Sequence, residues 1–200
     1  MGYPGAQSYP SPNFHTGRSA AVSHVVLHTT EGDLPSSLAT LTDPFRSDSE
    51  GGRVSAHYLV APSGTIYQLV DDSNTAWAAQ AANPYSINIE VVGFAGSPAT
   101  WTAPVIQSLG SLAGWLASEY GIPLVYREDP ASPPLARGFV AHGALQPQDR
   151  SDPGPYFPWD EVRAAATPGA PALGSEISRE WLGLVALALA AAALAWSLTK

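Results

Sequence analysis

The sequence predicts an α/β fold: one layered domain in which helices flank a central mixed β-sheet. Short β-branched runs and longer amphipathic runs alternate along the first 166 residues, as they do when strands and helices form alternating layers. The chain of 200 residues suits one domain with an ordinary core, and without Cys that core must form without disulfides. We therefore expect a domain over residues 1–166, a linker and a C-terminal apolar helix.

Residues 1–22 are rich in Pro and Gly and are expected to form an irregular arm over the domain. They contain neither a basic start nor an apolar run of the length that a secretory signal requires, so they are not typical of such a signal. His15 in this arm is expected to be exposed rather than to bind an ion.

Five segments have the composition of β-strands, with β-branched or alternating apolar residues bounded by turn residues. They are Ser23–His28, Val54–Val60, Thr65–Val70, Ser86–Val92 and Gly138–His142. In the first of these strands, His24 and His28 would share a face but lie about 13 Å apart. The two histidines therefore cannot bind one ion, and His24 is expected to be structural or solvated.

Three segments predict helices: Pro35–Thr42, Ala103–Tyr120 and Trp159–Ala166. The middle helix places its apolar residues three and four positions apart, which gathers them on one side. These residues are Val105, Ile106, Leu109, Leu112 and Leu116. Such a stripe suits packing against one face of a sheet.

The chain after residue 166 differs in composition from the domain. Residues 167–178 are a Pro/Gly/Ala-rich linker, and residues 179–200 contain the uncharged run Trp181–Leu198. As a helix this run would be about 27 Å long, near the lower limit for a membrane span, and a Trp stands near each end. The alternative is a soluble packing helix, because the Ala content lowers the hydropathy. We expect a transmembrane helix over 179–200 that associates the protein with a membrane.

Charge and composition exclude several function classes. A net charge of −8, with eight Arg and one Lys, argues against nucleic-acid binding and against a basic wall-anchoring surface. Without Cys there can be no thiolate metal site, so any metal ligands must be nitrogen or oxygen atoms. The chain has no G-x-S-x-G motif, which disfavours a serine hydrolase.

Three residues could form a split metal site: His28 follows an apolar run, and His142 and Asp152 stand ten positions apart. A catalytic zinc ion takes three protein ligands from imidazole and carboxylate groups and keeps one position open. The segment around Asp152 is rich in Pro and Gly and could turn this residue back toward His142. From spacing alone the alternative of ordinary solvated residues stays open, because such sets often arise by chance.

Longer motifs narrow this choice. The chain reads VVLHTTEG at Val25–Gly32, VSAHYLVAPSGTIYQLV at Val54–Val70, SINIE at Ser86–Glu90 and AHGALQPQDRSDPGPYFPW at 141–159. In this order the motifs resemble the zinc-dependent N-acetylmuramoyl-L-alanine amidases of type 2, a family that includes phage amidases and animal peptidoglycan recognition proteins. The resemblance runs from about Tyr3 to about Ala166. It implies a Zn²⁺ ion bound by His28, His142 and Asp152, and peptidoglycan as the partner and substrate.

The resemblance also implies roles for other residues. Glu90 corresponds to the acid that transfers protons in members that read SIGIE, whereas strand alternation alone would favour an ordinary solvated face. Arg150 stands where members commonly carry Lys and would stabilise the oxyanion, and a surface arginine is the alternative. Asn88 and Trp77 are expected to contact the substrate, although Trp77 could equally be a core aromatic.

Three positions bear on how closely the chain follows the family. Ala56 stands where some members have Tyr, which disfavours a tyrosine-assisted mechanism. Ala78 stands where many members have His, which removes a substrate-contacting imidazole. His57 is expected to pack beside the site rather than to act as a fourth ligand.

Together these features predict a zinc amidase that cuts the bond between N-acetylmuramic acid and the L-alanine of the stem peptide. The N-terminal composition and the C-terminal apolar run favour a phage or prophage endolysin that starts in the host cytoplasm and acts on the cell wall. The alternative is a recognition protein that binds peptidoglycan without cutting it. Such relatives usually lack a metal ligand, and this chain has all three candidates. The sequence leaves the oligomeric state open.

Overall fold

The computed structural model of the chain describes residues 2–128 and 137–166. The linker expected at 167–178 and the apolar helix expected at 179–200 lie outside the described residues. Within the described part of the chain, no helix is long and apolar enough to cross a membrane.

A seven-stranded sheet forms the centre of the domain, in the order β1-β5-β4-β7-β3-β9-β8. In that order the strands are Gln7–Ser8, Ile66–Gln68, Tyr58–Val60, Ser86–Val91, His24–Thr29, Gly138–Ala141 and Tyr126–Arg127. Strands β4 and β5 pair antiparallel, and the other neighbours pair parallel. The predicted mixed sheet is therefore confirmed. A separate pair joins β2 (Phe14–His15) to β6 (Thr75–Ala76).

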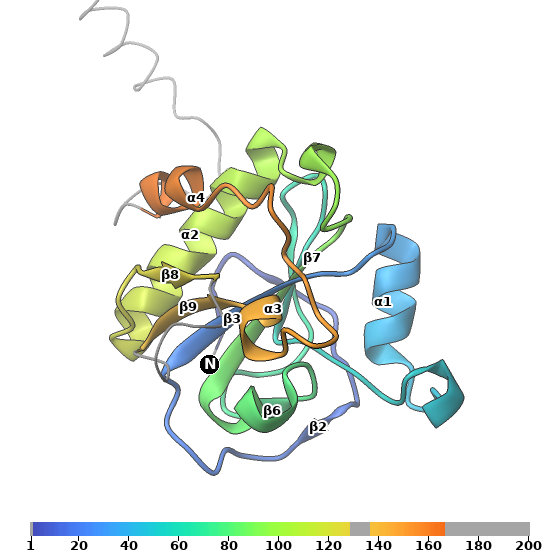
Figure 1. Cartoon of the computed structure of the whole chain (residues 1–200). Helices are drawn as coiled ribbons and strands as arrows, with labels where there is room; N and C mark the ends of the chain where they lie inside the picture. The colour runs from blue at the N-terminus through green and yellow to red at the C-terminus, as the bar shows by residue number, and fades with distance from the viewer. Residues whose placement is uncertain (1, 129–136, 167–200) are drawn as a thin grey trace, which may run out of the picture.

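Helices cover both faces of the sheet (Figure 1). The α-helices are α1 (Leu34–Thr42), α2 (Ala103–Tyr120), α3 (His142–Leu145) and α4 (Trp159–Ala165). Short 3-10 helices span Asp48–Glu50, Gln80–Tyr85 and Pro98–Thr100, labelled η1, η2 and η3. Helix α4 packs directly on α2, where a Cβ at Gly110 would lie 2.5 Å from the Cβ of Ala165. Glycine at this position therefore permits the close approach of the two helices.

Side-chain alternation along the central strands separates a core face from a polar face. Leu27 on β3 and Ile89 on β7 join Leu109 of α2 in the largest apolar cluster. Because successive side chains of a strand point to opposite faces, His28 and Glu90 project on the side of the sheet away from α2. The sheet thus places these two polar residues together, with α1 and α3 near them.

The structure corrects some of the predicted elements. The N-terminal arm is not wholly irregular, because it contributes β1 to the main sheet and β2 to the small one. The strand predicted at Val54–Val60 is confined to Tyr58–Val60. The strand predicted at Gly138–His142 ends at Ala141, because His142 begins helix α3. By contrast, the prediction for Ala103–Tyr120 is confirmed with the same bounds.

Candidate metal centre and active site

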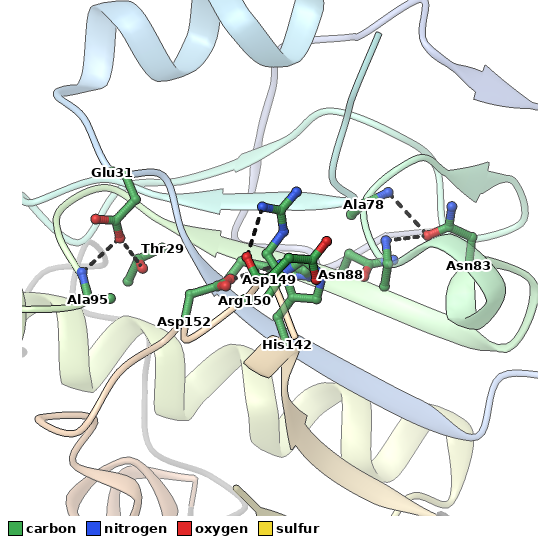
Figure 2. Close-up of polar contacts among 12 residues, drawn as sticks. Thr29, Glu31, Ala78, Asn83, Asn88, Ala95, His142, Asp149, Arg150 and Asp152 are labelled. Carbon is green, nitrogen blue, oxygen red and sulfur yellow. Dashed lines mark hydrogen bonds and ion pairs between the residues drawn. The ribbon is translucent and has the colours of Figure 1, made fainter. Parts of the chain in front are cut away.

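Two imidazole nitrogens and one carboxylate oxygen meet at the carboxyl end of β3. The Nδ1 atoms of His28 and His142 lie 2.9 Å apart, and Asp152 Oδ2 lies 3.2 Å from the first and 3.1 Å from the second. Figure 2 shows His142 and Asp152 turned toward the same point. The structure therefore brings together the three residues that the sequence suggested as metal ligands.

Three different kinds of element supply these side chains. His28 is in the buried strand β3, His142 is the first residue of α3, and Asp152 belongs to the loop that follows α3. The Gly143 N–H donates to the carbonyl of Asp152 at 2.9 Å, which ties the loop to the start of α3. A Cβ at Gly143 would lie 3.0 Å from the Cα of Ser151, so a glycine is what lets the loop come this close.

The donor set fits a zinc ion. One ligand atom from each of the three residues lies within 4.8 Å of the others, and His28 and His142 are buried while Asp152 is partly buried. Two imidazoles and a carboxylate are the ligand types of catalytic zinc sites that keep a coordination position open. The group would therefore be held by His28, His142 and Asp152.

The charges of this cluster shift its pKa values. Burial opposes ionisation of Asp152, but its contacts with the His142 and His28 rings outweigh it and hold the pKa of this carboxyl well below its usual range. Burial lowers the pKa of His142. Burial also acts to lower the pKa of His28, yet its contacts with Asp152 and the charge of Glu90 raise it overall. Asp152 is thus an anion beside two imidazoles, as a cation site requires.

Glu90 lies beside the cluster on the neighbouring strand. It is the register partner of His28 in the parallel pair β3 and β7. Its Oε2 atom is buried and has no hydrogen-bond partner among the described residues. Burial raises the pKa of Glu90 to about 7, and the negative charges of Asp152 and Glu31 act in the same direction. A carboxyl group with a pKa near neutrality can both accept and donate a proton at physiological pH.

A cavity of about 540 Å³ opens over these residues. Its walls come from β3, α1, the start of α3 and the loop before Asp152. The lining includes His28, Thr29, Thr30, Glu31, Gly32, Ser36, Ser37, Thr40, Leu41, Val54, Ala78, Glu90, His142, Asp149, Arg150, Ser151 and Asp152. The metal-ligand candidates and Glu90 therefore face one common space that is large enough for part of a ligand.

Arg150 is exposed and lines this cavity. Its Nη1 lies 3.4 Å from the carbonyl of Asp149, and Figure 2 shows this contact next to Asp152. The guanidinium makes no ion pair with another described residue that would hold it away from the cavity. Its position lets it contact a molecule bound in the cavity, and the role that the motifs imply for it stays a prediction.

Two residues expected to contact substrate do not line the cavity. Asn88 is fully buried, and its Oδ1 is 3.1 Å from His28 Nε2, so its amide is directed at a ligand candidate. Trp77 is half-buried and packs 5.0 Å from the His15 ring, with the Arg53 guanidinium 5.1 Å from its centroid. Asn88 thus contacts a ligand candidate and Trp77 packs beside the cavity, and a contact of either residue with substrate stays a prediction.

The remaining histidines lie where they were expected. His15 is exposed, and His24 is buried with its Nδ1 2.7 Å from Ser23 Oγ. His57 is buried behind the site, where its Nδ1 accepts from the backbone N–H of Asn88 at 2.9 Å. None of these three contributes to the metal-ligand cluster.

Glu31 is a cavity residue that the sequence did not single out. Its Oε1 accepts from Thr29 Oγ1 at 2.7 Å and from the Ala95 N–H at 2.8 Å, as Figure 2 shows. Its backbone has φ of 52°, a left-handed conformation that is unusual for a residue other than glycine. Its position in the sequence, three residues after His28, is the signal that could have identified it as a residue of the site. Glu31 joins the end of β3 to the loop after β7 and adds negative charge near Glu90.

Ala78 lines the cavity at the position where the resemblance implies a histidine in many members. Asn83 in η2 holds this segment, because its Oδ1 accepts from the N–H groups of Ala78 at 3.1 Å and Ala79 at 2.6 Å (Figure 2). The wall is therefore ordered but carries only a methyl group at this point.

Comparisons with known proteins find matches over most of the described domain. A family model described as N-acetylmuramoyl-L-alanine amidase (Amidase_2) matches residues 18–155. N-acetylmuramoyl-L-alanine amidase A of Achromobacter lyticus is 32% identical over 158 residues, which cover 74% of this chain and 85% of that protein. AmiD of Escherichia coli is 33% identical over 160 residues, which cover 69% of this chain and 51% of that protein.

Solved structures are similar over most of the described domain. A crystal structure of AmpD is similar with a TM-score of 0.65 at 27% identity, and the match covers 82% of this chain and 96% of that one. AmpDh3 of Pseudomonas aeruginosa, in complex with an anhydromuramic pentapeptide, is similar with a TM-score of 0.55 at 26% identity. That match covers 82% of this chain and 65% of the other.

Proposed function

The chain belongs to the Amidase_2 family of N-acetylmuramoyl-L-alanine amidases, and from this premise we propose that it is a zinc-dependent hydrolase of peptidoglycan. The bond cut would be the amide between the lactyl group of N-acetylmuramic acid and the L-alanine of the stem peptide. The observation that carries the proposal is the meeting of His28, His142 and Asp152 with Glu90 in one cavity.

Zinc held by the three ligands would polarise the scissile carbonyl and lower the pKa of a coordinated water molecule. Glu90 supplies the proton transfers: its carboxylate takes a proton from the attacking water and then gives one to the leaving amine. Its free Oε2 and its pKa of about 7 suit both steps. Glu31 and Asp152 help to keep this pKa high.

Arg150 supplies positive charge at the cavity wall. The carbonyl oxygen of the substrate gains negative charge when water adds, and a cationic hydrogen-bond donor beside it lowers the barrier. Arg150 lines the cavity next to Ser151 and Asp152, so it can reach an amide held near the ligands. A guanidinium can donate two parallel hydrogen bonds, whereas the lysine common in relatives acts as a point charge.

Product analysis tests the reaction. The full chain would be incubated with a soluble muropeptide that carries N-acetylmuramic acid and a stem peptide, and the products would be identified by mass spectrometry. We expect the free stem peptide with an unblocked L-alanine and the intact sugar. Cleavage between sugars, or between amino acids of the stem, would overturn the proposal.

A recognition protein that only binds peptidoglycan is the second candidate. The complete set of ligand candidates and the unpartnered acid of Glu90 favour an enzyme, because binding alone needs neither. Binding of the muropeptide by the zinc-loaded chain without any product would establish this alternative.

We also propose a lytic role as an endolysin, with the apolar run 181–198 bringing the hydrolase to a membrane. The support for membrane contact is the uncharged sequence of this run. Fractionation of the full chain and of a version that ends at Ser178 tests it. We expect only the full chain in the membrane fraction. Equal solubility of the two versions would contradict membrane contact through residues 181–198.

A further inference from the structure

A chain of hydrogen bonds runs from the backbone of η2 to the metal-ligand candidate His28. It starts at the carbonyl of Ala82, which can only accept. Ser86 Oγ lies 2.8 Å from this oxygen and donates its single proton to it. The Ser86 oxygen is then left as an acceptor for Asn88, whose side-chain nitrogen lies 3.2 Å away.

These contacts fix the orientation of the Asn88 amide. Only the NH₂ group can donate to Ser86 Oγ, so the amide oxygen must face the other way. That oxygen lies 3.1 Å from His28 Nε2. Because an amide oxygen only accepts, Nε2 must carry the proton of the ring. The tautomer of His28 is therefore set by Ala82, Ser86 and Asn88. This chain of hydrogen bonds reaches the metal-ligand cluster through the His28 ring.

The consequence appears at the opposite ring nitrogen. An imidazole must be neutral to bind a metal ion and then carries one proton, so with Nε2 protonated the Nδ1 atom of His28 presents the lone pair. This Nδ1 atom lies 2.9 Å from His142 Nδ1 and 3.2 Å from Asp152 Oδ2, at the centre of the cluster. The lone pair thus points to the place where a cation would bind.

Asn88 itself has little freedom to turn. It is fully buried on the central strand β7, and its backbone N–H donates to His57 Nδ1 at 2.9 Å. Its carbonyl accepts from the His57 N–H at 3.0 Å. The chain of Ala82, Ser86 and Asn88 is therefore buried and held at both its backbone and its side chains.

We propose that Asn88 is a positioning residue for zinc, which acts by holding His28 in the tautomer whose Nδ1 lone pair faces the metal site. The related sequences that read SIGIE have glycine at this position, so the device is a property of this chain's SINIE motif. The inference rests on the proposed function for the identity of the metal. Its hydrogen-bond logic uses only residues of the chain.

Two measurements on the full chain test this role without using hydrolysis. The ring ¹⁵N shifts of His28 in the metal-free protein, recorded at a pH at which the ring is neutral, report its tautomer, and competition with a chelator gives the zinc dissociation constant. In the wild-type protein we expect a protonated Nε2. In Asn88→Leu we expect a mixture of tautomers and zinc binding weaker by about 10- to 100-fold.

Two further variants separate positioning from packing. Asn88→Asp keeps an oxygen acceptor for Nε2, although it can no longer donate to Ser86 Oγ, so we expect it to keep the wild-type tautomer of His28. Ser86→Ala removes the acceptor that orients the amide, so we expect a loss in the same direction as Asn88→Leu but smaller. If Asn88→Leu does not fold, the comparison of Ser86→Ala with the wild type decides the question.

The proposal is overturned if folded Asn88→Leu and Ser86→Ala keep the wild-type tautomer of His28 and bind zinc as tightly as the wild type. A wild-type chain that binds zinc with the expected tautomer but releases no stem peptide would overturn the proposed function alone. The two failures are therefore distinguishable.

Discussion

His28 on β3 and Glu90 on β7 are register partners in adjacent parallel strands. Neighbouring strands lie about 4.8 Å apart, and paired residues have side chains on the same face. The spacing between the ligand candidate His28 and the proposed proton-transfer group Glu90 is therefore set by backbone pairing in the buried centre of the sheet. His142 and Asp152, by contrast, reach the same point from a helix start and a loop.

Replacing the acid tests the role of Glu90. We expect Glu90→Gln to lower kcat by about 100-fold or more, because an amide cannot take the proton from water. Zinc content should be unchanged, since Glu90 is not one of the ligand candidates. Steady-state hydrolysis of a muropeptide and metal analysis of the same sample check both points. Asp149→Asn removes another carboxylate from the cavity. An equal loss in that variant would mean that charge, rather than proton transfer, is what matters.

Arg150 can be tested by comparing two substitutions. We expect Arg150→Ala to lower kcat by about 100- to 1,000-fold with a smaller change in KM, because the positive charge acts on the oxyanion of the transition state. Arg150→Lys should recover most of the activity, since relatives commonly carry Lys there. Measured kcat and KM for both variants decide the matter. Full activity in Arg150→Ala would make this residue an ordinary surface arginine.

Zinc should stabilise the folded protein. A ligand that binds only the native state at about 100 times its Kd adds about 2.7 kcal/mol to the free energy of unfolding. We expect added zinc to raise the Tm of the wild type, and His28→Ala to abolish this rise. His15→Ala serves as the control, because His15 is an exposed histidine outside the cluster. A zinc-induced rise in Tm that survives in His28→Ala would place the ion elsewhere.

Asp72 should make the free energy of unfolding fall as the pH rises. Burial raises its pKa to about 6, against the opposing hydrogen bonds of Tyr58 and Tyr120. Since the pKa of Asp72 is near 3.8 when unfolded, the folded state binds more protons between these values, and stability falls as the pH rises through this window. Once the pH is above 6, the free energy of unfolding has fallen by about 3 kcal/mol relative to its value below pH 3.8.

The measurement for Asp72 is denaturant unfolding at several pH values between about 3 and about 7, a window that extends about one unit beyond each of the two pKa values. We expect Asp72→Asn to become more stable relative to the wild type as the pH rises. The asparagine oxygen can still accept from Tyr120, whose hydroxyl lies 3.0 Å from Asp72 Oδ2. A difference between the two proteins that does not change with pH would show that Asp72 has an ordinary pKa.

Much of the fold could be predicted because periodicity reports burial. The apolar stripe of Ala103–Tyr120 has helical spacing over its whole length, and this helix has the predicted bounds. Strands of two residues, such as β1 and β2, give no periodic signal, and they form only because distant segments pair with them. Val54–His57 is β-rich in composition, but it adjoins β4 without joining the ladder.

The site could be predicted in part for a similar reason. His28, His142 and Asp152 stand in motifs that resemble those of the family. This resemblance, rather than the spacing of the three residues, predicted that they lie together. The role of Asn88 could not be read in this way. Alternation along the strand places Asn88 on the polar face, but only the structure reveals that His28, rather than a substrate, is the partner of its amide.

The most direct test of the central claim is the release of free N-terminal alanine from purified peptidoglycan by the full chain. The reaction would be run as purified, with a metal chelator, with zinc restored, and with His142→Ala in place of the wild type. We expect release that the chelator stops, that zinc restores and that His142→Ala lacks. Release that is unchanged by the chelator and by His142→Ala would contradict a zinc amidase built on His28, His142 and Asp152.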